Sequence, residues 1–162
     1  MRDSGSDRAG EAAETVLLVD DNPDDRELTL MAIRSLPRRV EVVQAADGLE
    51  AMEFLRPPAG AGGGGAGGGA GATRPRPALI LLDVNMPRLD GKQFLQRLRA
   101  DASLPRIPVA MFTTSTAPWD VDESYAAGCN VYLVKPFAAE ELTRMLGDLF
   151  RLYLDFAELP SR

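Results

Sequence analysis

Four short apolar runs, none of which alternates with polar residues, are the feature of this sequence that most limits its fold. They cover residues 16–19, 78–82, 107–112 and 131–134. Runs of this length, rich in valine, isoleucine and leucine, are typical of strands that are buried on both faces of a parallel sheet. We therefore expect an α/β protein.

Helical patterns separate these strands, and a fifth strand is predicted near residues 40–44. The predicted helices lie near residues 23–36, 48–56, 91–101, 118–127 and 138–157. Strands that alternate with helices are typical of repeated βα units with right-handed crossovers. The sequence therefore predicts a doubly wound, five-stranded parallel sheet.

The start of the first predicted helix carries several helix-start signals. Asn22 can cap the helix, and Pro23 suits its first position. Asp24 and Asp25 lie where the positive end of the helix dipole favours acidic side chains. These signals assign Asp24 and Asp25 to the stability of the helix, but they leave the preceding Asp20–Asp21 pair unexplained.

The length of 162 residues suits one domain with additional segments. We expect a disordered tail at residues 1–14, a domain at residues 15–157 and a short tail at residues 158–162. Residues 57–77 are rich in glycine, alanine and proline, so we expect them to form a disordered loop insertion. The last helix, residues 138–157, should overhang the short strands of the sheet.

Composition disfavours several classes of function. The chain contains no histidine, which excludes imidazole catalysis, a zinc–histidine site and a phosphohistidine within this chain. No apolar stretch approaches the ~18 residues of a membrane span, and no apolar signal core is present, so we expect a cytoplasmic protein with no membrane partner. The net charge of -6 argues against nucleic acid as a partner.

Polar residues follow the four apolar runs at the point where each predicted strand ends. Asp20 and Asp21 follow the first run, Asp83 the second, Thr113 the third and Lys135 the fourth. Because the carboxyl ends of parallel strands open onto one crevice, we expect these side chains to share a small pocket. Lys135 is one of only two lysines, which favours a specific role, although chance use of a lysine there is left open.

Three carboxylates in one pocket cannot all stay ionised without a counter-charge. Mg²⁺ is suited to this place because it prefers carboxylate and carbonyl oxygens, water and phosphate oxygens. We predict that Asp21 and Asp83 bind Mg²⁺, with the backbone carbonyl of Asn85 as a third ligand. Asp20 is expected to act through water.

A carboxylate beside such a metal ion can attack phosphorus and form an acyl phosphate. Asp83 is the predicted nucleophile. The Thr113 hydroxyl and the Lys135 ammonium group would contact the phosphoryl oxygens and stabilise their charge. The predicted chemistry is therefore Mg²⁺-dependent phosphoryl transfer to Asp83.

The order and spacing of these motifs resemble a known family. From about Thr15 to Phe150 the chain resembles the receiver domain of bacterial two-component response regulators. The resemblance rests on Asp20-Asp21, on Leu82-Asp83-Val84-Asn85-Met86-Pro87 with Asp90-Gly91, on Thr113, and on Lys135-Pro136-Phe137. It implies a flavodoxin-like (CheY-like) sheet of order 2-1-3-4-5. It also implies that Asp83 accepts a phosphoryl group from a partner histidine kinase.

The same resemblance implies roles for other residues. Asp20 and Asp21 would help to bind Mg²⁺, and the Lys135–Pro136 peptide bond would be cis. Signalling would run through Thr113, shifting toward the phosphoryl group, and through Tyr132 on strand five, turning inward. From its sequence position alone, Tyr132 is equally compatible with a half-buried strand aromatic that has no switching role.

A narrower resemblance is to the small standalone regulators paired with bacterial phytochrome kinases. It rests on Asp21-Asn22-Pro23-Asp24-Asp25, on the stretch from Ala100 to Val109, on Thr113-Thr114-Ser115-Thr116, and on a long last helix running to Leu159-Pro160. It implies a light-sensing kinase, a bacteriophytochrome, as the phosphodonor.

Two other functions compete with a phosphorylated receiver. Aspartate-nucleophile phosphatases also assemble aspartate, a hydroxyl, lysine and Mg²⁺ on a parallel sheet, but they resemble one another in an Asp-x-Asp motif after the first strand. Here Asp20 and Asp21 are adjacent, and the expected nucleophile, Asp83, follows a later strand. A phosphorylation-independent adaptor is disfavoured because every position of the site is filled.

The last predicted helix carries more apolar residues than one packing face needs. Its core-facing stripe consists of Leu142, Met145, Leu146 and Leu149. The apolar character continues beyond this stripe at Phe150, Tyr153, Leu154 and Phe156.

Exposed aromatic clusters usually mark interfaces, and some phytochrome-linked regulators pair through this end. We predict a symmetric homodimer through Phe150, Tyr153 and Leu154. A tail that folds back over its own domain is the alternative.

Overall fold

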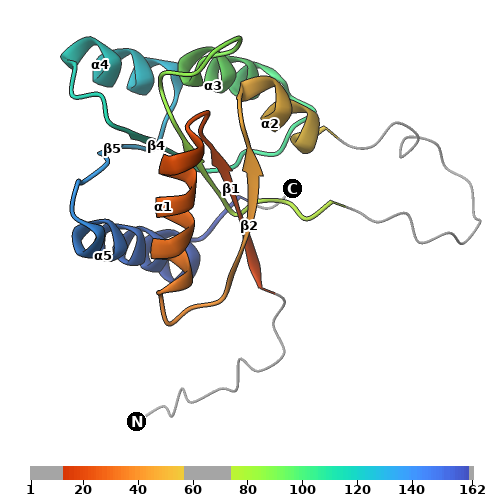
Figure 1. Cartoon of the computed structure of the whole chain (residues 1–162). Coiled ribbons are helices and arrows are strands. Elements are labelled where there is room, and N and C mark those ends of the chain that lie inside the picture. Colours follow the sequence, from red (N-terminus) through yellow and green to blue (C-terminus); the bar gives the residue numbers. More distant parts are fainter. Residues whose placement is uncertain (1–12, 57–73, 161–162) are drawn as a thin grey trace, which may run out of the picture.

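The computed structural model describes residues 13–56 and 74–160 of the chain (Figure 1). Five parallel strands form one sheet in the order β2-β1-β3-β4-β5, which confirms the predicted doubly wound, flavodoxin-like fold. The strands are β1 (Glu14–Val19), β2 (Val40–Ala45), β3 (Leu79–Leu82), β4 (Val109–Thr113) and β5 (Val131–Val134). The helices are α1 (Pro23–Arg34), α2 (Gly48–Leu55), α3 (Gly91–Ala100), α4 (Pro118–Ala127), α5 (Ala139–Phe150) and the π-helical segment η1 (Arg151–Phe156).

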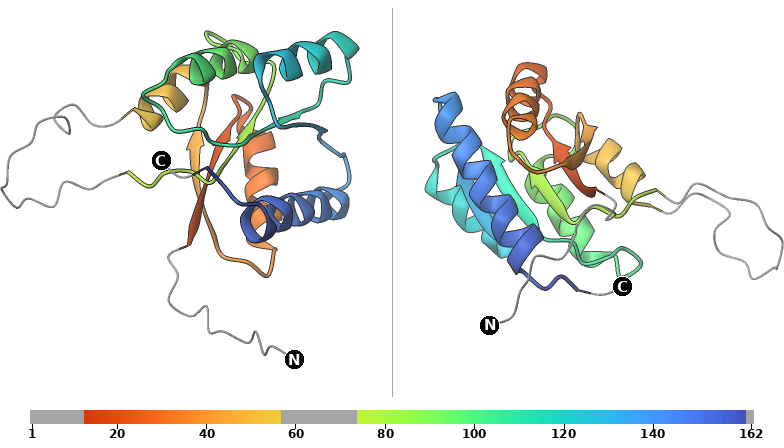
Figure 2. Two further views of the ribbon diagram at one scale, coloured as in Figure 1. Left: turned by 180° about the vertical axis from the view of Figure 1, so that it is seen from behind. Right: turned by 90° about the horizontal axis from the view of Figure 1, so that it is seen from below.

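Helices cover both faces of the sheet, as Figure 1 and the two views of Figure 2 show. α1 packs beside α5 on one face, and α2, α3 and α4 lie along the other. Side chains of the central strands alternate between two cores. Leu17, Ile80 and Met111 belong to the core beneath α2, α3 and α4, whereas Leu18 and Leu81 belong to the core beneath α1 and α5. This double burial explains why the central strands have no polar alternation.

The register of the sheet brings the ends of its strands to one edge. β1 ends at Val19, which pairs with Leu82, the last residue of β3. Asp20 and Asp83 follow directly after these two strands and are therefore neighbours at the edge. Lys135, the residue after β5, lies at the same edge, where its side chain reaches Asp20.

Several strand boundaries differ by one or two residues from those expected. β4 begins after Pro108, two residues later than predicted, because proline has no N–H group to donate to the ladder. It also continues through Thr113. β1 begins at Glu14, which pairs with Val40 and therefore lies in the sheet rather than in the predicted N-terminal tail.

Parts of the predicted domain organisation lie outside the described residues. These parts are residues 1–12 of the N-terminal tail, residues 57–73 of the insertion and residues 161–162 at the C-terminus. Residues 74–77, the end of the predicted insertion, have no regular structure. Of the helices that the structure describes, none has the length and apolar character required to cross a bilayer.

The C-terminal segment is more closely integrated into the domain than expected. Phe150 is only 1% exposed and lies in the core beneath α1 and α5, so its prediction as an exposed dimer residue is wrong. The reason is helical geometry: Phe150 lies one turn beyond the buried Leu146 and on the same face. Tyr153 and Leu154 are half-buried against this core. Asp155 is bound by Arg38, with 2.6 Å between the charged atoms, which fastens η1 to the domain.

Candidate functional site

Three carboxylates gather at the strand ends, as the sequence predicts. One carboxylate oxygen from each of Asp20, Asp21 and Asp83 lies within 4.8 Å of the others. Asp20 is buried, Asp21 is exposed and Asp83 is partly buried, so the cluster extends from the core to the surface. An all-oxygen donor set of this kind fits a hard divalent cation. Asn85 lies two residues beyond Asp83 and is exposed, and its role as a carbonyl ligand remains a prediction.

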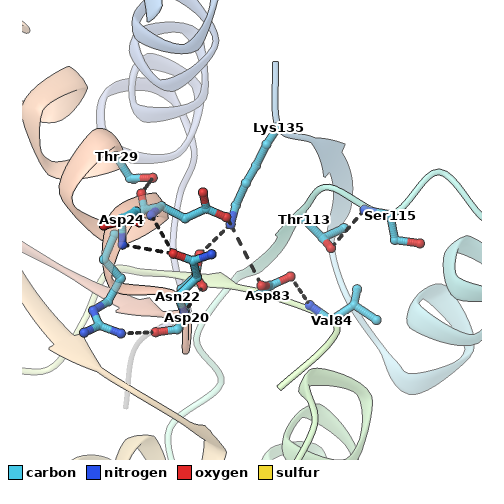
Figure 3. A network of polar contacts seen from close by, with 11 residues as sticks. Asp20, Asn22, Asp24, Thr29, Asp83, Val84, Thr113, Ser115 and Lys135 are labelled. Carbon is cyan, nitrogen blue, oxygen red and sulfur yellow. Dashed lines mark hydrogen bonds and ion pairs between the residues drawn. The ribbon is translucent and has the colours of Figure 1, made fainter. Parts of the chain in front are cut away.

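Lys135 supplies positive charge to this cluster from the end of β5 (Figure 3). Its ammonium group pairs with Asp20 and lies 3.4 Å from Asp25 and 3.9 Å from Asp83. Burial alone would lower the pKa of Lys135, but the hydrogen bond with Asp20 and the charges of Asp83, Asp20 and Asp25 raise it overall. Lys135 therefore remains a cation at the centre of the acidic cluster.

Asp25 is a site residue that the sequence reasoning assigned only to helix stability. The helix-start reading is correct, since the Asn22 side chain accepts the backbone N–H groups of Asp24 and Asp25 at 2.9 and 3.1 Å. The Asp25 carboxylate also faces Lys135, however. Its position could have indicated a place in the site, because Asp25 lies on the first turn of a helix that starts only two residues after the Asp20–Asp21 pair.

Asp83 is held by the loop after β3. Its Oδ1 accepts a hydrogen bond from the backbone N–H of Val84 at 2.8 Å, and the Thr113 hydroxyl lies near its carboxylate. Burial raises the pKa of Asp83, while Lys135 and Thr113 act in the opposite direction. Thr113 is fully buried at the end of β4.

Gly91 allows the loop after β3 to fold closely around Asp83. Its N–H donates to the carbonyl of Val84 at 2.9 Å. A Cβ atom at residue 91 would lie only 2.0 Å from the backbone carbonyl oxygen of Asp83. Only glycine fits this approach, because no side-chain atom can occupy that space without moving the backbone.

The expectation of a cis bond before Pro136 is wrong in this structure. The described residues contain no cis peptide bond. The trans form is favoured by about 0.5–1 kcal/mol in an ordinary X–Pro bond. With a trans bond, Lys135 still reaches the acidic cluster.

Tyr132 is half-buried on β5, and its hydroxyl donates to the backbone carbonyl of Ser115 at 3.0 Å. This contact ties β5 to the loop that follows Thr113 at the end of β4. The switching role of Thr113 and Tyr132 stays a prediction. The sequence reasoning did not identify Ser115 or its partners Asp120 and Lys92 as part of this region, because their pairing joins three separate elements.

Comparison with known proteins supports one family. Residues 64–147 match the response regulator receiver domain. The response regulator Rcp1 of Synechocystis is 33% identical over 148 residues, which cover 91% of this chain and 94% of Rcp1. The crystal structure of the Mn²⁺-bound form of Rcp1 has a TM-score of 0.72 at 33% identity, covering 91% of this chain and 99% of that chain.

Two further solved structures are similar along almost the whole chain. The phosphorylated cyanobacterial phytochrome response regulator RcpA has a TM-score of 0.75 at 35% identity, covering 93% of this chain and 100% of that one. The bacteriophytochrome response regulator AtBRR has a TM-score of 0.64 at 33% identity, covering 94% and 100%. These similarities do not favour the phosphatase alternative. The chain belongs to the response regulator receiver-domain family, whose members accept phosphoryl groups in two-component signalling.

Proposed function

We propose that this protein is a single-domain response regulator that takes a phosphoryl group onto Asp83 and signals by binding other proteins. The observation that carries the proposal is the meeting of Asp20, Asp21, Asp83 and Lys135 at one sheet edge in a chain of the receiver family. The phosphodonor is a phosphohistidine on a partner kinase, since this chain has no histidine.

The transfer step uses residues that already face one another. A carboxylate oxygen of Asp83 attacks phosphorus, a new P–O bond forms, and the P–N bond to the kinase breaks with its electron pair returning to the imidazole. Lys135 and the Thr113 hydroxyl lie where they can contact the phosphoryl oxygens. Hydrolysis of the acyl phosphate restores the Asp83 carboxylate.

Mg²⁺ is the proposed cofactor, held by Asp20, Asp21, Asp83 and the backbone carbonyl of Asn85. When bound, it would neutralise charge on the phosphoryl oxygens. The acidic cluster supports this assignment, as does the Mn²⁺-bound form of the similar protein Rcp1. Asp21 is the most exposed of the three carboxylates and so the ligand whose replacement disturbs the fold least.

Replacing Asp21 by asparagine is expected to raise the Mg²⁺ concentration needed for phosphorylation by roughly 10-fold or more, because the site loses a charged oxygen ligand. The measurement is intact-mass spectrometry of the protein incubated with acetyl phosphate over a range of Mg²⁺ concentrations. Wild type should gain one phosphoryl group, and a chelator should prevent the gain.

Asp24→Asn is the matched control, since Asp24 is also acidic and exposed but does not belong to the cluster. Its Mg²⁺ dependence should equal that of wild type. An Asp21→Asn protein with the wild-type Mg²⁺ midpoint would remove Asp21 from the ligand set. Phosphorylation that continues unchanged in chelator would contradict the metal requirement altogether.

We also infer that the kinase is a phytochrome of bacterial type. The similarity to RcpA and to AtBRR supports this inference, because both are phytochrome-linked response regulators. A kinase that draws on ATP works in the cytoplasm, and we place the regulator there.

The site is built from residues on both sides of residues 57–77, which supports the proposal that this segment is an insertion within one receiver domain.

The homodimer remains a proposal, now centred on η1. Leu152 and Phe156 are 55% and 68% exposed and flank the half-buried Tyr153 and Leu154. We expect light scattering to give twice the chain mass for wild type. Leu152→Glu combined with Phe156→Glu should give a folded monomer, because neither side chain is part of the core.

The control for the dimer test is a pair of charged substitutions on another apolar surface. Leu28 and Met31 are similarly exposed on α1, at 54% and 58%, and their replacement by glutamate should leave the mass doubled. A wild-type protein that is monomeric at tens of micromolar, both with and without phosphorylation, would refute the dimer.

A further inference from the structure

A chain of polar contacts links α3 to the loop after β4. Asp120, in the first turn of α4, is only 7% exposed. Its Oδ1 accepts a hydrogen bond from the ammonium group of Lys92 on α3 at 2.9 Å. Its Oδ2 accepts a hydrogen bond from the hydroxyl of Ser115 at 2.6 Å. These bonds, that of Ser115 first, hold the pKa of Asp120 below its usual range, so the buried group is a carboxylate.

Ser115 is the point at which these contacts meet the phosphoacceptor site. Its backbone N–H donates to the Thr113 hydroxyl oxygen at 3.2 Å, a contact visible in Figure 3. Its backbone carbonyl accepts the Tyr132 hydroxyl at 3.0 Å. The side chain, N–H and carbonyl of Ser115 therefore tie Asp120, Thr113 and Tyr132 into one arrangement.

The hydrogen bond from the Ser115 N–H limits the other hydrogen bonds that the Thr113 hydroxyl can make. A threonine hydroxyl has one hydrogen to donate. Because the Thr113 oxygen accepts a hydrogen bond from the Ser115 N–H, its own hydrogen is free to point toward the nearby Asp83 carboxylate. Phosphorylation makes one Asp83 oxygen the bridging oxygen of an acyl phosphate and places new acceptor oxygens farther from the backbone. For Thr113 to follow those oxygens, its bond with Ser115 has to lengthen or break.

The Asp120 anchor is strong enough to oppose this movement. Hydrogen bonds between ionised groups are shorter and roughly twice as strong as neutral ones. Lys92 also pairs with Glu123, whose side chain is exposed one turn farther along α4. Ala117, the residue before α4, provides no side-chain cap, which leaves Ser115 and Asp120 as the polar contacts that order this loop.

We propose that Lys92 and Asp120 are positioning residues that act through Ser115. They form a latch that holds residues 113–117 in the unphosphorylated arrangement, and the latch opens when Thr113 engages the phosphoryl group. This inference rests on the proposed function at Asp83. Its consequence is that the latch limits the population of the phosphorylation-competent arrangement, so weakening the latch raises the rate of phosphorylation.

The test compares Ser115→Ala with Ser115→Thr. The alanine variant loses the hydroxyl that binds Asp120 and that accepts the Ala117 N–H, whereas the threonine variant keeps a hydroxyl at the same place. With acetyl phosphate and Mg²⁺, Ser115→Ala should be phosphorylated roughly threefold faster than wild type or more, and Ser115→Thr should stay near the wild-type rate. Lys92→Met should also be faster, because Asp120 loses its cationic partner.

Fluorescence of Trp119, the only tryptophan, provides a second measurement that a purely structural role would not move. Trp119 is 67% exposed and adjoins Asp120. The emission of unphosphorylated Ser115→Ala should be shifted toward that of phosphorylated wild type. Glu123→Gln is the control, because it removes the other ion pair of Lys92 and leaves Asp120 and Ser115 in place; its rate and emission should match wild type.

The outcomes separate this inference from the proposed function. If wild type takes up no phosphoryl group, the proposed function fails. If wild type is phosphorylated and Ser115→Ala and Lys92→Met show wild-type rates and emission, the latch is overturned. A fall in the rates of folded variants, checked by thermal melting, would also overturn it.

Discussion

Asp83→Asn is expected to lose phosphorylation completely, so that its intact mass stays unchanged after incubation with a histidine kinase, ATP and Mg²⁺. The amide has no anionic oxygen to attack phosphorus and form an acyl phosphate. Its carbonyl oxygen can still accept the N–H of Val84, the bond that Asp83 makes at 2.8 Å, so the loop and the fold should be kept. Wild type should gain the mass of one phosphoryl group.

Asp122→Asn is the matched control for this substitution. Asp122 is an exposed carboxylate on α4 outside the acidic cluster, and its replacement should leave labelling at the wild-type level. Labelling of Asp83→Asn equal to that of wild type would mean that another residue is the acceptor. Peptide mapping of the labelled protein would then identify it.

The second large effect is expected on stability, from Gly91→Ala. The new Cβ atom would lie 2.0 Å from the carbonyl oxygen of Asp83, and its neighbour is backbone rather than a side chain that can turn away. Overpacking usually costs about 1–3 kcal/mol, and we expect about 3 kcal/mol or more here because the backbone itself must move. The melting midpoint should fall by roughly 6–12 °C for a domain of this size.

Gly147→Ala in α5 is the control, because residue 147 has room for a side chain. Its Cβ atom would lie 3.2 Å from the Cδ2 atom of Leu36, a side-chain end that can adjust. Alanine in a helix gains up to about 1 kcal/mol over glycine, so this variant should match or exceed wild type in stability. Equal melting midpoints for Gly91→Ala and wild type would show that the loop after β3 yields easily.

The predictable part of this protein follows from periodicity and strand polarity. Continuous apolar runs specify strands buried on both faces, and parallel strands place their carboxyl ends at one edge. From the sequence alone, those two rules predict that four side chains lie together at this edge: Asp20, Asp83, Thr113 and Lys135. The helix start at Pro23 follows equally from local chemistry, since a cap depends on residues two and three positions away.

Packing between elements that are distant in the sequence decided which residues are buried and which charges meet. Phe150 was expected at an exposed interface, but the rotation of α5 against α1 places it in the core. Asp25 faces Lys135, 110 residues away along the chain, because the start of α1 and the end of β5 open onto the same edge of the sheet. Local rules cannot supply such pairs, because helix rotation depends on every side chain in the core.

The sequence by itself determined the fold, the acidic cluster and its lysine, because each depends on a residue's position relative to its own strand. Only the tertiary structure decided the connection from Lys92 through Asp120 to Ser115. That connection joins α3, α4 and the loop after β4, and its members are 28 and 5 residues apart. The physical reason is that a buried carboxylate requires partners from whichever elements surround it, and those elements become neighbours only when the chain has folded.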